Sequence, residues 1–121
     1  MAETIFQRCG GFATVRKVVS AFYDKVLDEE NLQQYFNDVD MRRLIDHQTK
    51  FIASMMGGPA SFSNDALQRV HATLGISHDD YLLVAGLLRE TLEDFEIERG
   101  DIEVVYREIM SRESLIVTRR G

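Results

Sequence analysis

The side chains best suited to chemistry are three histidines, His47, His71 and His78. No Glu-x-x-His pair and no His-Glu-x-x-His segment occurs, so the ligand spacings of a di-iron bundle and of a zinc protease are missing. His71 falls beside Val70 and Leu74 on the apolar face of a predicted short helix. Spacing alone favours a structural histidine, hydrogen-bonded to the backbone, over a metal ligand.

Two further polar side chains are predicted to face a core. Gln48 lies between Leu44 and Phe51 on one helical face, and Tyr23 falls beside the apolar stripe of an earlier helix. A buried amide or phenol needs a partner, because leaving a polar group unpaired costs roughly 1–3 kcal/mol. When Tyr23 or Gln48 is considered alone, a position at the edge of the core explains it. Together, Tyr23, Gln48 and His71 predict three polar groups pointing into one core.

Helical periodicity predicts the elements that carry these residues. A helix over 12–27 has an inward stripe formed by Phe12, Val15, Val19, Phe22 and Val26. Thr4 can cap a shorter helix that ends at Gly10-Gly11. Residues 28–40 are polar and predict short turns, which lie over the core through Leu32, Tyr35 and Phe36. A second long helix covers 41–56, with Asp40 as its N-cap, and Gly57-Gly58-Pro59 ends it.

The second half of the chain continues the same pattern. Asn64 can cap a short helix over 65–74, which carries His71. Ser77 and Asp80 have the spacing of a capping box at the start of a helix that continues to Phe95. Gly100 interrupts, and a last helix begins at Asp101. No segment alternates as a strand does, so we predict an all-α fold.

Composition limits the class of protein. The chain has 121 residues, which suits a single domain over 1–121, and its net charge of −6 opposes nucleic-acid binding. Cys9 is the only cysteine, so no intramolecular disulfide can form. No signal peptide and no run of about 20 apolar residues is present. We therefore expect a soluble, cytoplasmic protein with no membrane association. Separately, His78 lies beside Asp79 and Asp80 at the start of its helix, which predicts a surface position.

The chain resembles the truncated haemoglobins, specifically their first group, over nearly its whole length. The blocks that keep the family's spacing are Gly10-Gly11, Phe22-Tyr23, Lys25-Val26-Leu27, Tyr35-Phe36, Met41, Leu44, His47-Gln48, Gly57-Gly58-Pro59, Val70-His71 and Leu74-Gly75-Ile76. The chain has no tryptophan, which also favours the first group over the other two.

The resemblance implies a two-over-two helical sandwich around haem b. His71 would be the proximal iron ligand, and Tyr23 and Gln48 would be the distal donors to bound dioxygen, with Leu44 beside them. Further residues would form the apolar contacts to the porphyrin, namely Phe36, Phe51 and Ile76. Because bound dioxygen has superoxide character, phenol and amide donors in a dry pocket would slow its release.

Two positions leave alternatives open. Phe62 falls in the cofactor-binding loop where many relatives have tyrosine, so a hydrogen bond to a haem propionate is lost there. His47 lies at the rim of the inward stripe, where the resemblance allows two roles. One is a propionate partner or exposed rim residue, and the other is a second, internal iron ligand. The first role is favoured.

Two function classes follow. The first is a haem-binding globin that reversibly binds dioxygen and other diatomic gases, in oxygen transport or in nitric oxide detoxification as a nitric oxide dioxygenase. No catalytic residue is assigned, and turnover would need an external reductase, since no flavin or nicotinamide motif is present. The second is a haem-free helical module for protein–protein interaction, which explains the periodicities but not the inward polar groups. In either class we expect a monomer or a weak homo-oligomer.

Overall fold

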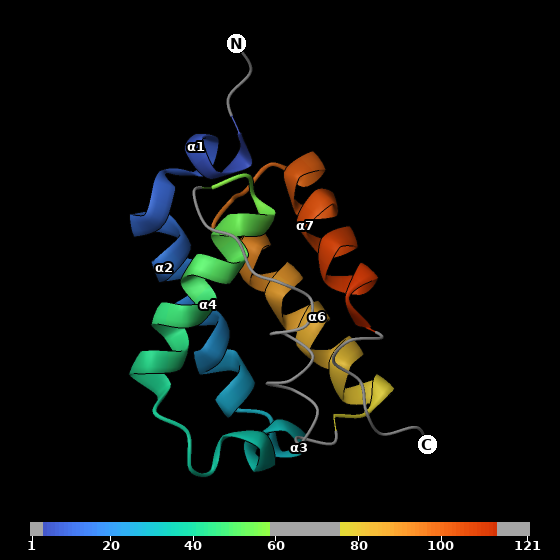
Figure 1. The fold of residues 1–121 in the computed structure, drawn as a ribbon. Helices are drawn as coiled ribbons and strands as arrows, with labels where there is room; N and C mark the ends of the chain where they lie inside the picture. The colour runs from blue at the N-terminus through green and yellow to red at the C-terminus, as the bar shows by residue number, and fades with distance from the viewer. Residues whose placement is uncertain (1–3, 59–75, 114–121) are drawn as a thin grey trace.

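The computed structural model describes residues 4–58 and 76–113, and its elements are helical (Figure 1). In chain order they are α1 (Ile5–Cys9), α2 (Gly11–Leu27), α3 (Glu30–Gln33), the 3₁₀ turn η1 (Gln34–Phe36), α4 (Met41–Met55), α6 (His78–Asp94) and α7 (Arg99–Ser111). The predicted all-α class is confirmed. The helix expected over 65–74 lies outside the described residues.

The long helices form two layers. In Figure 1, α4 crosses α2 on one side, while α6 and α7 run side by side on the other. The same pairs pack against each other, and α2 also contacts α6 and so joins the layers. This is the two-over-two sandwich predicted from the resemblance. None of the helices in the described ranges has both the length and the apolar character needed to cross a membrane.

The core is centred on α2. Its stripe is confirmed for Val15, Val19, Phe22 and Val26, and Val18 and Tyr23 are also buried. The prediction was wrong for Phe12, which remains 42% exposed. Phe12 lies in the first turn of α2, and its ring makes an edge-to-face contact with Phe6 in α1, with centroids 4.8 Å apart. A periodic pattern predicts the direction of a side chain, but burial also needs a neighbouring element on that side.

The predicted N-caps of three helices are present. Thr4 accepts from the backbone N–H of Gln7 and completes a capping box with the Gln7 side chain. Asp40 caps α4 by accepting from the N–H of Arg43. Ser77 caps α6 by accepting from the N–H of Asp80, but the second half of the expected box is not formed. The Asp80 carboxylate instead accepts a hydrogen bond from another element, which is described with the site below.

The Gly57-Gly58 pair ends α4 and packs against Phe6 of α1. Gly57 has φ 86°, and the N–H of Gly58 returns to the carbonyl of Ala53 at 2.8 Å, as in a Schellman motif. A Cβ on Gly58 would lie 2.9 Å from that carbonyl oxygen and 3.0 Å from the Phe6 ring. The pair therefore provides both the left-handed turn and the space against which Phe6 packs.

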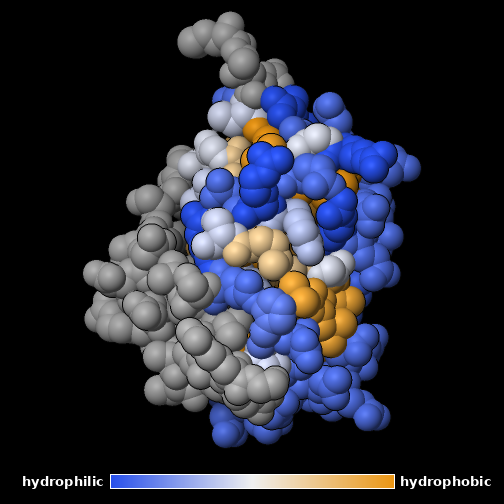
Figure 2. Space-filling view, turned by 90° about the vertical axis from the view of Figure 1, so that its right-hand side faces the viewer, coloured by the Kyte–Doolittle hydropathy of each residue, from blue (hydrophilic) through white to orange (hydrophobic). Residues whose placement is uncertain are grey.

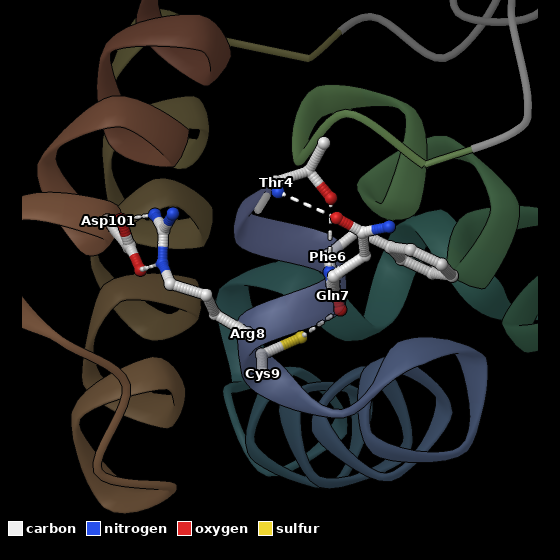
Figure 3. Close-up of polar contacts among 6 residues, drawn as sticks. All are labelled: Thr4, Phe6, Gln7, Arg8, Cys9 and Asp101. Carbon is white, nitrogen blue, oxygen red and sulfur yellow. Dashed lines mark hydrogen bonds and ion pairs between the residues drawn. The ribbon is translucent and has the colours of Figure 1, made fainter. Parts of the chain in front are cut away.

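An ion pair fixes the other side of α1. Figure 3 shows Arg8 reaching from α1 to Asp101 in the first turn of α7, with Nη2 and Oδ1 2.5 Å apart. Helix α1 thus contacts both layers, at the C-terminal end of α4 through Phe6 and at the first turn of α7 through Arg8.

The turn between α6 and α7 lies earlier than expected. Glu96 adopts φ 58°, and the N–H of Ile97 returns to the carbonyl of Leu92, which completes a Schellman motif without glycine. Gly100, expected to break the chain, lies inside the first turn of α7. Glycine weakens a helix by roughly 0.5–1 kcal/mol relative to alanine, through backbone entropy, but does not by itself end it.

Candidate functional site

The polar group best placed for chemistry is the phenol of Tyr23 on α2. The side chain is 7% exposed, and its ring makes edge-to-face contacts with Phe22 at 4.9 Å and with Phe36 at 5.9 Å between centroids. Burial raises the pKa of Tyr23 well above the ordinary value of a tyrosine. The phenol is therefore protonated at neutral pH and can donate a hydrogen bond.

The Tyr23 hydroxyl donates to no other described residue. Every side-chain nitrogen or oxygen that is completely shielded from solvent in the described part of the chain does have a partner. A protonated donor that no described group accepts is suited to a ligand that enters from outside the protein.

Helix α4 presents three of the predicted site residues on one face. Leu44, Gln48 and Phe51 are spaced by four and three positions, and Phe51 is 7% exposed while the other two are half-buried. The amide of Gln48 makes no hydrogen bond to another described residue. The opposite side of the stripe, through Thr49 and Ile52, is buried more deeply, since α4 packs against α2. The predicted stripe is thus present, and its Gln48 side remains partly open.

The other predicted apolar residues lie on short segments. Phe36 ends η1 and is half-buried with its ring against Tyr23, while Ile76 is half-buried just before α6. The structure thus brings Phe36 and Tyr23 together directly. His71 and Phe62 lie outside the described residues, so their predicted roles stay predictions.

The two described histidines are both exposed. His47 lies on the outer side of α4, next to Asp46, whose carboxylate pairs with Arg16 of α2. His78, predicted to be a surface residue, has a side chain that is 56% exposed and pairs with Glu113. The surface position of His78 is confirmed, and the exposure of His47 suits the rim role better than the iron-ligand role.

Two contacts around the site were not predicted. The Tyr35 hydroxyl of η1 donates to Asp80 Oδ2 of α6 at 2.5 Å. The Arg112 guanidinium, at the end of α7, lies 5.9 Å from the centroid of the Phe51 ring. Both contacts join residues distant in sequence, and no local pattern marks such pairs. The i,i+4 spacing of Glu108 and Arg112 is visible in the sequence, but it indicates only their mutual ion pair.

Comparison with known proteins identifies the family. Residues 4–116 match the bacterial-like globin family. The chain therefore belongs to the bacterial-like globins. Globins hold haem iron through a proximal histidine, so family membership implies a haem-binding chain.

Similar proteins of known sequence agree with the first-group resemblance. A group 1 truncated haemoglobin of Mycolicibacterium paratuberculosis is 36% identical over 89 residues, which are 74% of this chain and 65% of that protein. A group 1 truncated haemoglobin of Synechocystis is 28% identical over 99 residues, covering 78% of this chain and 80% of its own length. The chain thus spans about two thirds of the mycobacterial relative.

Solved structures confirm the fold. The truncated haemoglobin of Tetrahymena pyriformis in its Fe(III) form superposes with a TM-score of 0.86 at 23% identity, covering 95% of this chain and 98% of that chain. The 2/2 haemoglobin of Synechococcus superposes with a TM-score of 0.85 at 24% identity, covering 97% and 100%. A group II truncated haemoglobin of Bacillus anthracis reaches 0.87 at 19% identity, so the fold is common to more than one group.

The described residues fit a haem on chemical grounds. A porphyrin needs flat apolar walls and a polar side where the iron ligand sits. Phe36, Phe51 and Leu44 provide apolar surface, and Tyr23 and Gln48 provide two donors without described partners. The ring of Tyr23 lies against Phe36, so one of these donors adjoins an apolar wall residue directly.

Proposed function

We propose that this chain binds one haem b through His71 and reversibly binds dioxygen, with Tyr23 and Gln48 as the donors to the ligand. The observation that carries the proposal is the buried, protonated Tyr23 phenol that no described residue accepts, in a chain of the globin family. When bound, haem supplies an iron that takes up a diatomic ligand. This proposal keeps His71 in the role that the resemblance implies.

The chain's own residues act by donating and by excluding water. A ligand that carries partial negative charge accepts from the Tyr23 phenol, and burial strengthens that hydrogen bond because little water competes for it. The Gln48 amide is a second donor from α4. The rings of Phe36 and Phe51, together with Leu44 and Ile76, limit the access of water. His47, exposed on α4, serves as a rim partner for a propionate.

We extend the proposal to nitric oxide as a second diatomic substrate. Nitric oxide and dioxygen would combine to give nitrate at the cost of one electron from the ferrous haem, so each turnover would need one electron from an external donor. The support from this chain is the same buried donor, which holds dioxygen long enough for nitric oxide to arrive. The sequence has no flavin or nicotinamide motif, so the electron would come from an external reductase.

The haem-free interaction module is less well supported. Four large hydrophobic side chains are exposed among the described residues, Phe12, Val39, Leu82 and Val104, and they belong to different segments. Figure 2 shows that the side of the molecule towards α7 is mostly hydrophilic, with smaller apolar areas between the charged side chains. Scattered apolar residues of this kind are normal for a protein surface.

An absorption spectrum of the purified protein tests the proposal. We expect an intense Soret band, a pyridine haemochrome spectrum typical of haem b, and a reversible spectral change when the reduced protein meets dioxygen. A protein that shows no Soret band and takes up no added haem would refute haem binding. Anaerobic addition of nitric oxide to the dioxygen-loaded protein then tests nitrate formation separately.

A further inference from the structure

A hydrogen bond joins the short turn η1 to the first turn of α6. The Tyr35 hydroxyl donates to Asp80 Oδ2 at 2.5 Å, across 45 residues of sequence. Asp80 is only 9% exposed, so this bond is shielded from water. Hydrogen bonds from a hydroxyl to a carboxylate are among the strong ones in proteins, especially when they are short. The contact therefore restricts η1 more than an exposed hydrogen bond would.

The restraint reaches Tyr23 through one neighbour. Tyr35 and Phe36 are consecutive in η1, and the Phe36 ring meets the Tyr23 ring edge to face at 5.9 Å and 77°. Phe22 contacts the same ring at 4.9 Å. The Tyr23 hydroxyl has no partner among the described residues, so the described contacts that orient the side chain are those with the rings of Phe22 and Phe36. The position of Phe36 thus decides part of that orientation.

The segment that carries Phe36 has few other polar anchors. Neither α3 nor η1 has a side-chain N-cap. Gln34 bonds to the carbonyl of Asn31 within the segment, and Gln33 reaches the carbonyl of Leu27 at the end of α2. Leu32 is fully buried and anchors the first half of the segment. In the half that carries Phe36, the Tyr35 hydroxyl reaches out of the segment to Asp80 of α6.

We infer that Tyr35 and Asp80 are positioning residues that, through Phe36, aim the Tyr23 hydroxyl at the diatomic ligand. This inference rests on the proposed role of Tyr23 as a donor to that ligand. Neither Tyr35 nor Asp80 needs to touch the ligand. Loss of their bond frees η1, lets the Phe36 ring shift, and leaves the phenol in more than one orientation.

The first test measures dioxygen release by stopped flow. We expect Tyr35→Phe to speed release about three- to tenfold, the range typical of coupled neighbours. Asp80→Ala should do the same, and Asp80→Asn, which keeps an oxygen acceptor, should have a smaller effect. In a Tyr23→Phe background Tyr35→Phe should add nothing. An equal acceleration in both backgrounds would overturn the inference, because the effect would then bypass Tyr23.

Tyr81→Phe is the matched control. It also removes one buried tyrosine hydroxyl, whose hydrogen bond goes to the Ile109 carbonyl, and it lies next to Asp80 in α6. General loss of stability should therefore be comparable in Tyr81→Phe and Tyr35→Phe. We expect release to be unchanged in the control, and an acceleration equal to that of Tyr35→Phe would contradict a specific positioning role.

A second measurement follows Tyr23 itself. The chain has four tyrosines, so labelling the tyrosine ring carbon that bears the hydroxyl with ¹³C gives a spectrum with few resonances. The purified protein is observed in its diamagnetic ferrous carbon monoxide form, or as isolated if it holds no haem. Tyr35→Phe should shift or split the Tyr23 resonance, and Tyr81→Phe should leave it in place.

The two measurements separate failure of the inference from failure of the proposed function. If Tyr23→Phe does not change release, the proposed donor role of Tyr23 is wrong, while a Tyr23 resonance moved by Tyr35→Phe still supports positioning. If the Tyr23 resonance is the same in Tyr35→Phe and wild type, positioning is wrong whatever the ligand kinetics show.

Discussion

Two buried tyrosines, one in each layer, differ in what their hydroxyls do. Tyr81 in α6 donates to the backbone carbonyl of Ile109 in α7, and Tyr23 in α2 donates to no described residue. Burial raises the pKa of both phenols, so both are protonated donors at neutral pH. The α6–α7 layer therefore contains a tyrosine hydroxyl with a described partner, and the α2–α4 layer contains one without.

The contrast extends to neighbouring side chains. In the α6–α7 layer, the buried Thr91 hydroxyl donates to the Leu87 carbonyl, and Arg89 pairs with Glu103 while stacking over the ring of Tyr106. In the α2–α4 layer, the half-buried Gln48 amide has no described partner. The α2–α4 layer also has paired hydroxyls, since Thr49 donates to the carbonyl of Ile45. The difference between the layers is therefore confined to Tyr23 and Gln48, which have no partner among the described residues.

The largest expected effect comes from His71, the predicted proximal iron ligand. His71→Ala should remove most of the haem, since an imidazole bond to iron is lost and the remaining contacts to the porphyrin are apolar. The ratio of Soret absorbance to protein absorbance measures the haem content. His78→Ala is the matched control, because His78 is exposed and pairs with Glu113. Full haem content and an unaltered deoxy-ferrous spectrum in His71→Ala would show that another residue holds the iron.

The next largest effect concerns ligand release. Tyr23→Phe should speed dioxygen dissociation by about one to two decades, the equivalent of a hydrogen bond worth ~1.5–3 kcal/mol. Gln48→Leu should act in the same direction, and the double variant should show less than the sum because both donors share one acceptor. Stopped-flow traces measure all three. Unchanged release in both single variants would mean that neither side chain touches the ligand.

The described helices could largely be predicted from the sequence, because caps and periodicity are local. Thr4, Asp40 and Ser77 were predicted as N-caps and are N-caps. The errors arise where a second element decides the outcome. Phe12 is exposed because, among the described residues, its ring contact is with Phe6 of α1. The chain turns at Glu96 rather than at Gly100 because a Schellman motif forms there without glycine.

The site could be predicted in its residue types but not in its connections. The inward direction of Tyr23 and the partial burial of Gln48 followed from helical spacing. The bond from Tyr35 to Asp80 did not, because it joins two segments whose meeting depends on the whole fold. Asp80 also has the spacing of a capping box with Ser77, and this local role accounted for the residue without any need for a partner distant in sequence.

A smaller effect should separate the tyrosines by stability. Tyr81→Phe removes a donor from the Ile109 carbonyl and should lower the free energy of unfolding by about 1–3 kcal/mol. Tyr23→Phe removes a hydroxyl without a described partner, so no described hydrogen bond is lost and the change should be nearly neutral. Urea unfolding of both variants in the same haem state compares them. An equal loss of unfolding free energy in the two variants would contradict the difference between a tyrosine hydroxyl with a described partner and one without.

The smallest effect is expected at His47, at the edge of the α2–α4 layer. Its imidazole could reach the iron only if α4 rotated, because the side chain is exposed. Rotation is opposed by Thr49 and Ile52, which are about 5% and 4% exposed against the core, and by the Gly57-Gly58 turn beneath Phe6. We therefore expect the ferrous protein without ligand to remain high-spin between about pH 6 and 8.

His47→Leu should leave that spin state unchanged and speed haem loss only about twofold, because an exposed contact to a propionate is worth ~0.2–1 kcal/mol. Transfer of haem to an excess of apomyoglobin measures the loss, and His78→Leu, which changes an exposed histidine in the other layer, should have no effect. Low-spin ferrous bands that disappear in His47→Leu would instead make His47 a second iron ligand. The α2–α4 layer would then supply an iron ligand as well, and dioxygen would have to displace His47 before Tyr23 and Gln48 could donate to it.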